Sequence, residues 1–286
     1  MKKIFIILLV FLVALLIACN NSKEKIGEPS KQNQEIQESG VGKESKEEIV
    51  TESEGTEGNN LEEQIPKKEE TKTAGLCYNP YFPVKPDTIW KYKVHCPGGD
   101  VYEYTSSFSG ITEKSFVEKL ISSKFSFNVN WLCSNDGLIQ NDYSELPFEG
   151  EFEDFEIATE NCEGVILPSY DQWVVGHKWD TKYKVKITFT VESEKMAFDG
   201  DVIIANEIAS IEPVTVPSGT YTDAIKINSK KTINQETKIE GSSMSFSAVS
   251  DISSWYVEGI GLVKKVSKSE CGTTLVELLS VEQEEI

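Results

Sequence analysis

Two segments of this chain alternate between apolar and polar residues, and the alternation restricts the possible fold more than any other feature. In segment 182–191 lysines and threonines separate the apolar residues, and in segment 125–131 serine and asparagines separate aromatic residues and valine. Side chains of a β-strand point alternately to the two faces of a sheet, so this period of two predicts strands with one buried and one solvated face. No segment shows the period of a long amphipathic helix, and the chain therefore favours an antiparallel sheet.

Similar alternating segments recur after Leu76 and are separated by turn-forming residues. The predicted turns are Pro97–Asp100, Asp136–Gly137, Asp199–Gly200, Pro217–Gly219 and Gly272, and Gly259 with Gly261 predicts a bend or bulge in a strand. This pattern predicts a meander of about ten strands, with a long irregular insert between residues 141 and 171. One-sided burial suits a curved sheet, so the expected fold is mainly β: a large curved antiparallel sheet, as a half-barrel or open barrel.

The composition divides the chain into three parts. Residues 1–18 have the positive start and apolar run of a signal peptide, which is too short to span a bilayer as a free helix. Residues 19–74 are rich in Glu, Lys, Ser and Gly and contain no aromatic residue, so we expect a disordered tether after Cys19. Residues 75–286 hold every Trp and Tyr and are numerous enough for one sizeable core, which predicts a single β-rich domain.

The sequence Leu16-Ile17-Ala18-Cys19 resembles the lipobox of bacterial lipoprotein precursors. The resemblance implies cleavage between Ala18 and Cys19 and attachment of a diacylglyceryl group to the Cys19 thiol. The domain would then be anchored by lipid at the extracytoplasmic face of the cell membrane or of an outer membrane. Asn20 is not the aspartate that suggests retention at the inner membrane, and the sequence does not tell whether the host has an outer membrane.

Several short motifs resemble, in the same order, those of a family of uncharacterised bacterial lipoproteins. They are Tyr81–Pro83 with Trp90–Tyr92, Trp131–Cys133 with Gly137-Leu138, Gly164–Pro168 with Trp173 and Trp179, Thr215–Tyr221, and Trp255–Lys264. The glycine that the family has between the first two motifs is absent here. The family has no assigned activity, and its strands resemble the half-barrel of periplasmic lipoprotein carriers. The resemblance therefore implies a curved sheet with an apolar hollow, by analogy of fold alone.

The sequence offers no constellation of catalytic residues. His95 and His177 are the two histidines, and neither has the spacing of a zinc site. Phosphate-binding loops, dinucleotide-binding loops and nucleophile elbows are absent, so we expect neither an enzyme nor a bound cofactor. A net charge of −19 and the lack of arginine argue against nucleic acid as a partner.

Acidic residues are concentrated in the predicted insert. Glu149, Glu151, Glu153 and Asp154 are weak candidates for calcium ligands, because carboxylate oxygens suit calcium. No EF-hand or repeat signature accompanies them, and a solvated acidic loop is the simpler interpretation.

An exported domain permits disulfide bonds. The mature domain contains five cysteines: Cys77, Cys96, Cys133, Cys162 and Cys271. Cys133 and Cys162 flank the acidic insert, so we expect them to pair and to hold the insert closed. The odd number leaves a thiol over unless a dimer forms, and the other pairings stay open.

These observations predict a lipid-anchored lipoprotein with a non-catalytic β-domain that binds a hydrophobic ligand or another component of the cell envelope. The alternative is a structural or adhesive surface protein that uses the acidic insert, either as a solvated loop or as a calcium site. The identity of the ligand or partner and the oligomeric state do not follow from the sequence.

Overall fold

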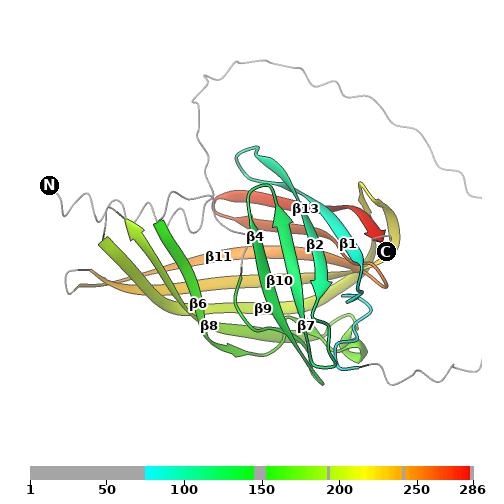
Figure 1. Cartoon of the computed structure of the whole chain (residues 1–286), viewed down its shortest axis with the longest axis horizontal. Helices are drawn as coiled ribbons and strands as arrows, with labels where there is room; N and C mark the ends of the chain where they lie inside the picture. Colours follow the sequence, from blue (N-terminus) through cyan, green and yellow to red (C-terminus); the bar gives the residue numbers. More distant parts are fainter. Residues whose placement is uncertain (1–74, 145–152, 192–193, 240–241, 284–286) are drawn as a thin grey trace, which may run out of the picture. The chain divides into compact units, whose positions relative to one another are not determined.

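A computed structural model describes residues 75–144, 153–191, 194–239 and 242–283. Within them thirteen antiparallel strands form one sheet, in the order β6-β8-β9-β10-β11-β12-β13-β1-β2-β3-β4-β5-β7 (Figure 1). The strands are β1 (Thr88–His95), β2 (Val101–Ser109), β3 (Ser115–Ser122), β4 (Ser126–Ser134), β5 (Gly137–Gln140), β6 (Glu153–Glu163), β7 (Leu167–Pro168), β8 (Lys178–Val191), β9 (Glu194–Val216), β10 (Gly219–Ile239), β11 (Ser242–Val257), β12 (Gly261–Ser269) and β13 (Gly272–Gln283). A 3-10 turn, η1 (Tyr170–Gln172), precedes β8. The mainly β fold predicted from the sequence is confirmed.

Over the ranges described above, no helix has the length and apolar character needed to cross a bilayer.

The alternation in the sequence matches the two faces of the strands. In β8, Tyr183, Val185 and Phe189 are each 1% exposed, whereas the lysines between them face solvent. In β4, Val129 and Trp131 are buried and the asparagines beside them are exposed. One face of the sheet is thus apolar and the other is solvated, as a period of two requires.

The sheet curves until strands from its two halves meet across the concave face. Trp131 of β4 and Phe116 of β3 share one hydrophobic cluster with Ile208 of β9 and Ile227 of β10. The same curvature makes β4 cross β9 and β10 in the view of Figure 1. In the described part of the chain no backbone ladder joins the edge strands β6 and β7, so the sheet is an open barrel.

Some turns and strands differ from the sequence-based prediction. The turns at Pro97–Asp100, Asp136–Gly137, Pro217–Gly219 and Gly272 are confirmed. The predicted turn at Asp199–Gly200 is wrong, because both residues lie inside β9. A Cβ atom at Gly200 would lie 2.0 Å from the backbone oxygen of Asn234, so glycine here permits close approach of β10. Gly259 lies within the hairpin turn between β11 and β12, and Gly261 begins β12, so neither glycine bends the middle of a strand.

The insert between residues 141 and 171 is less irregular than predicted. Its residues 153–163 form β6, which pairs with β8 at the edge of the sheet, and Leu167–Pro168 form β7. Glu156 and Glu160 of β6 are exposed, and Ile157 contacts the core. An edge strand tolerates this charged composition, which conceals the alternation of its sequence.

The segment before β1 packs across one end of the hollow. Tyr81 stacks on Trp173 at a ring-centroid distance of 4.4 Å, and Phe82 lies 5.0 Å from Trp131. The backbone of Pro80 accepts a hydrogen bond from the N–H of Gly259. The end of the barrel where β4 ends and β12 begins is therefore filled by aromatic side chains.

Candidate functional site

A cavity of about 450 Å³ lies on the concave side of the sheet. Strands β2 to β5 and β7 line one side of it, strands β8 to β13 line the other, and residues of the connecting turns complete the lining.

The floor of the cavity rests on the aromatic end of the barrel. Trp131 Nε1 donates a hydrogen bond to Glu118 Oε2 (3.1 Å), and Ser106 Oγ donates to Glu118 Oε1 (2.6 Å). Tyr256, which also lines the cavity, lies 5.5 Å from Trp173 between ring centroids. Burial raises the pKa of Glu118, and the two hydrogen bonds oppose that increase. Both carboxylate oxygens of Glu118 are therefore already bonded within the protein.

The other end of the cavity lies among turns. Pro97, in the turn between β1 and β2, and Glu270, in the turn between β12 and β13, both line it. A Cβ atom at Gly272 would lie 2.7 Å from Pro97 Cβ, so the two turns are in contact. Glu270 is exposed, so the cavity lining reaches solvent at this end.

Polar side chains are gathered on the part of the lining formed by β10, β11 and β12, which we call the lysine–serine wall. Three successive rows of paired residues cross these strands: Lys231, Ser250 and Ser269; Ser229, Ile252 and Ser267; and Ile227, Ser254 and Lys265. All nine residues line the cavity. Ser229 Oγ also donates to Asn206 Oδ1 of β9 (2.6 Å), which extends the polar surface by one strand.

A second part of the lining, formed by β2, β3 and β4, is mostly apolar, and we call it the aromatic–aliphatic wall. It consists of Tyr104, Leu120, Phe127 and Val129. Leu120 and Phe127 are directly paired across β3 and β4. In the sheet order, β13 and β1 separate this wall from the lysine–serine wall, so the curvature sets the two walls around one hollow.

The two lysines of the lysine–serine wall lie in a poorly solvated environment. Desolvation lowers the pKa of Lys231 to about 7, and the positive charge of Lys265 contributes to the shift. Desolvation also lowers the pKa of Lys265. Both side chains keep part of their surface accessible because they border the cavity. Lys265 therefore brings an ammonium group to the cavity lining, and Lys231 brings an amine that is only partly protonated at neutral pH.

Tyrosine hydroxyls complete the titratable groups of the cavity. Burial is the largest cause that raises the pKa of Tyr104, Tyr256 and Tyr183 above the ordinary range of a phenol. These side chains are neutral donors and acceptors at physiological pH. The lysines therefore supply the positive charge of this lining.

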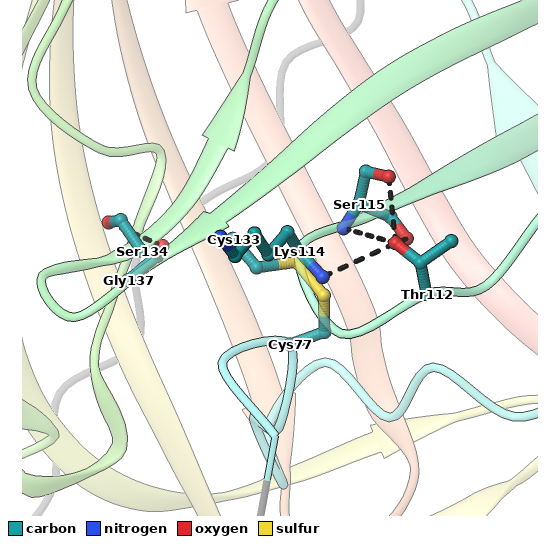
Figure 2. The surroundings of a disulfide bond; sticks show 7 residues. All are labelled: Cys77, Thr112, Lys114, Ser115, Cys133, Ser134 and Gly137. Atoms are coloured by element: carbon teal, nitrogen blue, oxygen red, sulfur yellow. Dashed lines mark hydrogen bonds between the residues drawn. A yellow bond between two sulfur atoms is a disulfide. The ribbon is translucent and has the colours of Figure 1, made fainter.

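The predicted disulfide between Cys133 and Cys162 is wrong. Cys133 bonds to Cys77, with 4.9 Å between the Cα atoms (Figure 2). Cys162 lies on the edge strand β6 as a free thiol, and its Sγ is 3.7 Å from the backbone oxygen of Gln140. Cys133 is instead on the inner face of β4, where the N-terminal segment passes. Cys271 is also disulfide-bonded.

Hydrogen bonds around Cys133 hold this part of β4 in place (Figure 2). The N–H of Cys133 donates to the backbone oxygen of Lys114 (2.8 Å), and Thr112 Oγ1 accepts from the N–H groups of Lys114 and Ser115. Ser134 Oγ donates to the oxygen of Gly137 in the following turn. The disulfide therefore attaches residue 77 to a hydrogen-bonded corner of the sheet.

The other predicted site residues are not brought together. Ala18, Cys19, Glu149 and Glu151 lie outside the described residues, so the lipidation site stays a prediction. Glu153 and Asp154 begin β6. Across the described ranges no group of three or more His, Cys, Asp or Glu residues has a metal-binding arrangement. His95 lies 4.0 Å from Glu277, and His177 stacks on Trp179 at 5.5 Å.

Sequence reasoning missed the lysine–serine wall. Lys231 is an even number of positions from Ile225, Ile227 and Ile233 along β10. The alternation of the strand therefore already placed Lys231 on the buried face. Lys265 gave no such signal, because its neighbour Lys264 is also a lysine and a bulge between Trp255 and Tyr256 shifts the register.

Neither a protein-family model nor a curated protein sequence matches the chain. Three solved structures are similar. An exported protein with a YmcC-like fold from Bacteroides fragilis is 11% identical, with a TM-score of 0.45, and the match covers 71% of this chain and 98% of that chain. A lipoprotein from Parabacteroides distasonis is 16% identical, with a TM-score of 0.44 and the same coverage of both chains. The hypothetical lipoprotein YmcC from Escherichia coli is 9% identical, with a TM-score of 0.28, over 68% of this chain and 85% of that chain.

Proposed function

We propose that this chain is a lipid-anchored, extracytoplasmic lipoprotein whose β-domain binds a hydrophobic ligand without catalysis. The observation that carries the proposal is the cavity of about 450 Å³ on the concave face of the sheet. A volume of this order is typical of small-molecule sites, which are concave and largely apolar with a few polar groups. The aromatic–aliphatic wall supplies the apolar surface, and the open end between the turns supplies an entrance.

Binding is proposed instead of catalysis because the sequence contains none of the motifs that place a nucleophile beside a general base. The curved sheet buries its apolar face on itself at the aromatic end and leaves apolar surface uncovered in the hollow. A ligand in the hollow would remove that surface from water, which stabilises the complex by about 25 cal/mol for each square ångström buried.

A variant that fills the cavity tests this function. Ala248 lines the cavity near its open end, so Ala248→Trp should occupy the entrance and part of the volume. We expect saturable binding of the fluorophore N-phenyl-1-naphthylamine by the mature chain from residue 20, exported behind a cleavable signal peptide. We expect the affinity to fall at least about tenfold in Ala248→Trp, because an occupied pocket loses most of its contact with the ligand.

The matched control is Ser247→Trp. Ser247 precedes Ala248 and is exposed, so its side chain points to the opposite face of β11. This variant should bind like the unaltered chain. Equal losses in both variants, or no saturable binding by the unaltered chain, would contradict the proposed function.

The anchor is tested separately. Cys19→Ser should abolish the incorporation of labelled palmitate, because the thiolate is the nucleophile that receives the lipid. The matched control is Cys162→Ser, which removes a cysteine of the sheet and should leave labelling unchanged. Undiminished labelling of the Cys19→Ser variant would show that residues 16–19 are not a lipobox.

A further inference from the structure

We infer that the ligand is an anionic amphiphile, in which a carboxylate or phosphate group is held by Lys265 and Lys231 while an apolar chain lies along the aromatic–aliphatic wall. The inference rests on the proposed function and adds the chemical class of the ligand. It follows from the division of the cavity lining into two chemically different walls.

Lys265 is enclosed by the barrel and has no partner within the described part of the protein. Among the described residues, Lys265 Nζ has no ion pair or hydrogen bond, although the side chain is enclosed by the barrel. An ammonium group that is withdrawn from water without a partner opposes folding. A methionine would fill the same space without that cost, so a lysine here indicates a partner that arrives from outside the chain.

Lys264, the residue before Lys265, differs from it in having partners within the protein. Lys264 points to the outer face, where its Nζ lies 3.7 Å from Glu277 Oε1 and 6.0 Å from the ring centroid of Trp255. The outer lysine therefore has partners within the protein. Lys265 is one position further along the same strand and has only the cavity in front of it.

Serine hydroxyl groups lie beside both lysines on the lysine–serine wall. In the rows that contain the lysines, Ser250, Ser254 and Ser269 are paired with Lys231 and Lys265 across β10, β11 and β12. A serine hydroxyl donates one hydrogen bond and a lysine ammonium donates three, so this wall is rich in donors. Carboxylate and phosphate oxygens accept such bonds and also neutralise the ammonium charge.

The remaining charged groups of the cavity fix the orientation. Glu118 lies at the floor and is the inward acidic side chain, with both of its oxygens bonded to Ser106 and Trp131. Glu270 lies at the exposed entrance. An anion is repelled from the floor and attracted to the row of Lys265, which lies between the two. Leu120 and Phe127, on the opposite wall, are left for the apolar chain.

Two variants test the inference with defined probes. The mature chain from residue 20 is titrated calorimetrically with laurate, dodecyl phosphate and dodecanol, which differ in the head group, and with inorganic phosphate and acetate, which have no apolar chain. We expect laurate or dodecyl phosphate to bind at least about tenfold more tightly than dodecanol, because hydrogen bonds to charged groups contribute more than neutral ones. Phosphate and acetate alone should bind weakly or not measurably.

Lys265→Met should remove this preference for an anionic head group, with a loss of about tenfold to a hundredfold for laurate and little change for dodecanol. Lys231→Met should act in the same direction. Lys264→Met removes the same charge from the outer face and should leave the preference intact. The ligand-free Lys265→Met variant should unfold at a higher temperature than the unaltered chain, because the desolvated charge is gone, which also shows that the variant is folded.

The outcomes separate the two proposals. Equal affinity for laurate and dodecanol, or an anionic preference that survives in Lys265→Met, would overturn the inference and leave the hydrophobic site. Tight binding of phosphate or acetate without a chain would show a site for small anions and would overturn the amphiphile. No binding of any chain-bearing probe would contradict the proposed function itself.

Discussion

Replacing Trp131 with alanine is expected to lower the free energy of unfolding by about 3–5 kcal/mol, the usual cost of truncating a buried tryptophan. Trp131 is 5% exposed and packs on Phe82 and Phe116 where the barrel is filled. The substitution also removes the donor to Glu118 and leaves one carboxylate oxygen without its hydrogen bond. Urea denaturation followed by circular dichroism measures the change.

Trp255→Ala is the matched control for this prediction. Trp255 is only partly buried on the outer face, where its Nε1 donates to Glu212 Oε1 (2.9 Å) and Lys226 lies over its ring. Trp255 packs only at the margin of a buried cluster, so we expect its truncation to cost less than that of Trp131, roughly 1–2 kcal/mol. Equal losses in the two variants would show that the aromatic end of the barrel is not a closely packed core.

Removing the disulfide between Cys77 and Cys133 is expected to destabilise the domain by roughly 4 kcal/mol in the chain-entropy model. The bond spans 56 residues in the sequence and holds the N-terminal segment against β4. Its loss lets residues 75–84 separate from the barrel, so Tyr81 and Phe82 should lose their contacts with Trp173 and Trp131. The double variant Cys77→Ala with Cys133→Ala and thermal unfolding measure the effect.

Cys162→Ala serves as the control for that variant. Cys162 is a half-buried free thiol on β6, so its removal should change the midpoint of unfolding little. A non-reducing peptide map should contain the 77–133 pair. A map that pairs Cys133 with Cys162, or a double variant as stable as the unaltered chain, would contradict the arrangement in Figure 2.

Alternation alone was enough to predict the sheet and its curvature. Residues 126–131 lie in β4 and residues 182–191 lie in β8, with the expected faces buried, because a period of two is a local property of a strand. A sheet with one apolar face has few ways to cover it, so the open barrel followed from the same observation.

Features that depend on more distant parts of the chain were not predictable in this way. The sequence Asp199-Gly200 is typical of a turn. In the structure, position 200 is a glycine because the backbone oxygen of Asn234 on the next strand leaves no room for a side chain. The strand β6 was hidden by its glutamates, which an edge position permits. Neither the approach of Asn234 to Gly200 nor the edge position of β6 can be inferred from the residues next to them in the sequence.

The same limit explains the disulfide and the cavity. Cys162 and Cys133 flank one insert in the sequence, but the curvature of the sheet places Cys77 beside Cys133. The hollow predicted from the sequence is present, yet its lining includes lysines and serines as well as apolar residues. The alternation of β10 already showed that Lys231 faces inward. That Lys231 and Lys265 line the same wall depends on the pairing of three strands.

The most direct test of a ligand in the hollow is the mass of whatever the protein carries. The mature chain from residue 20 is purified from the cell envelope without detergent, weighed by native mass spectrometry, and then denatured and extracted. We expect a bound amphiphile with a carboxylate or phosphate group, at a ratio approaching one per chain, that is depleted in Ala248→Trp and retained in Ser247→Trp. A native mass equal to that of the bare chain, with no lipid in the extract, would contradict it.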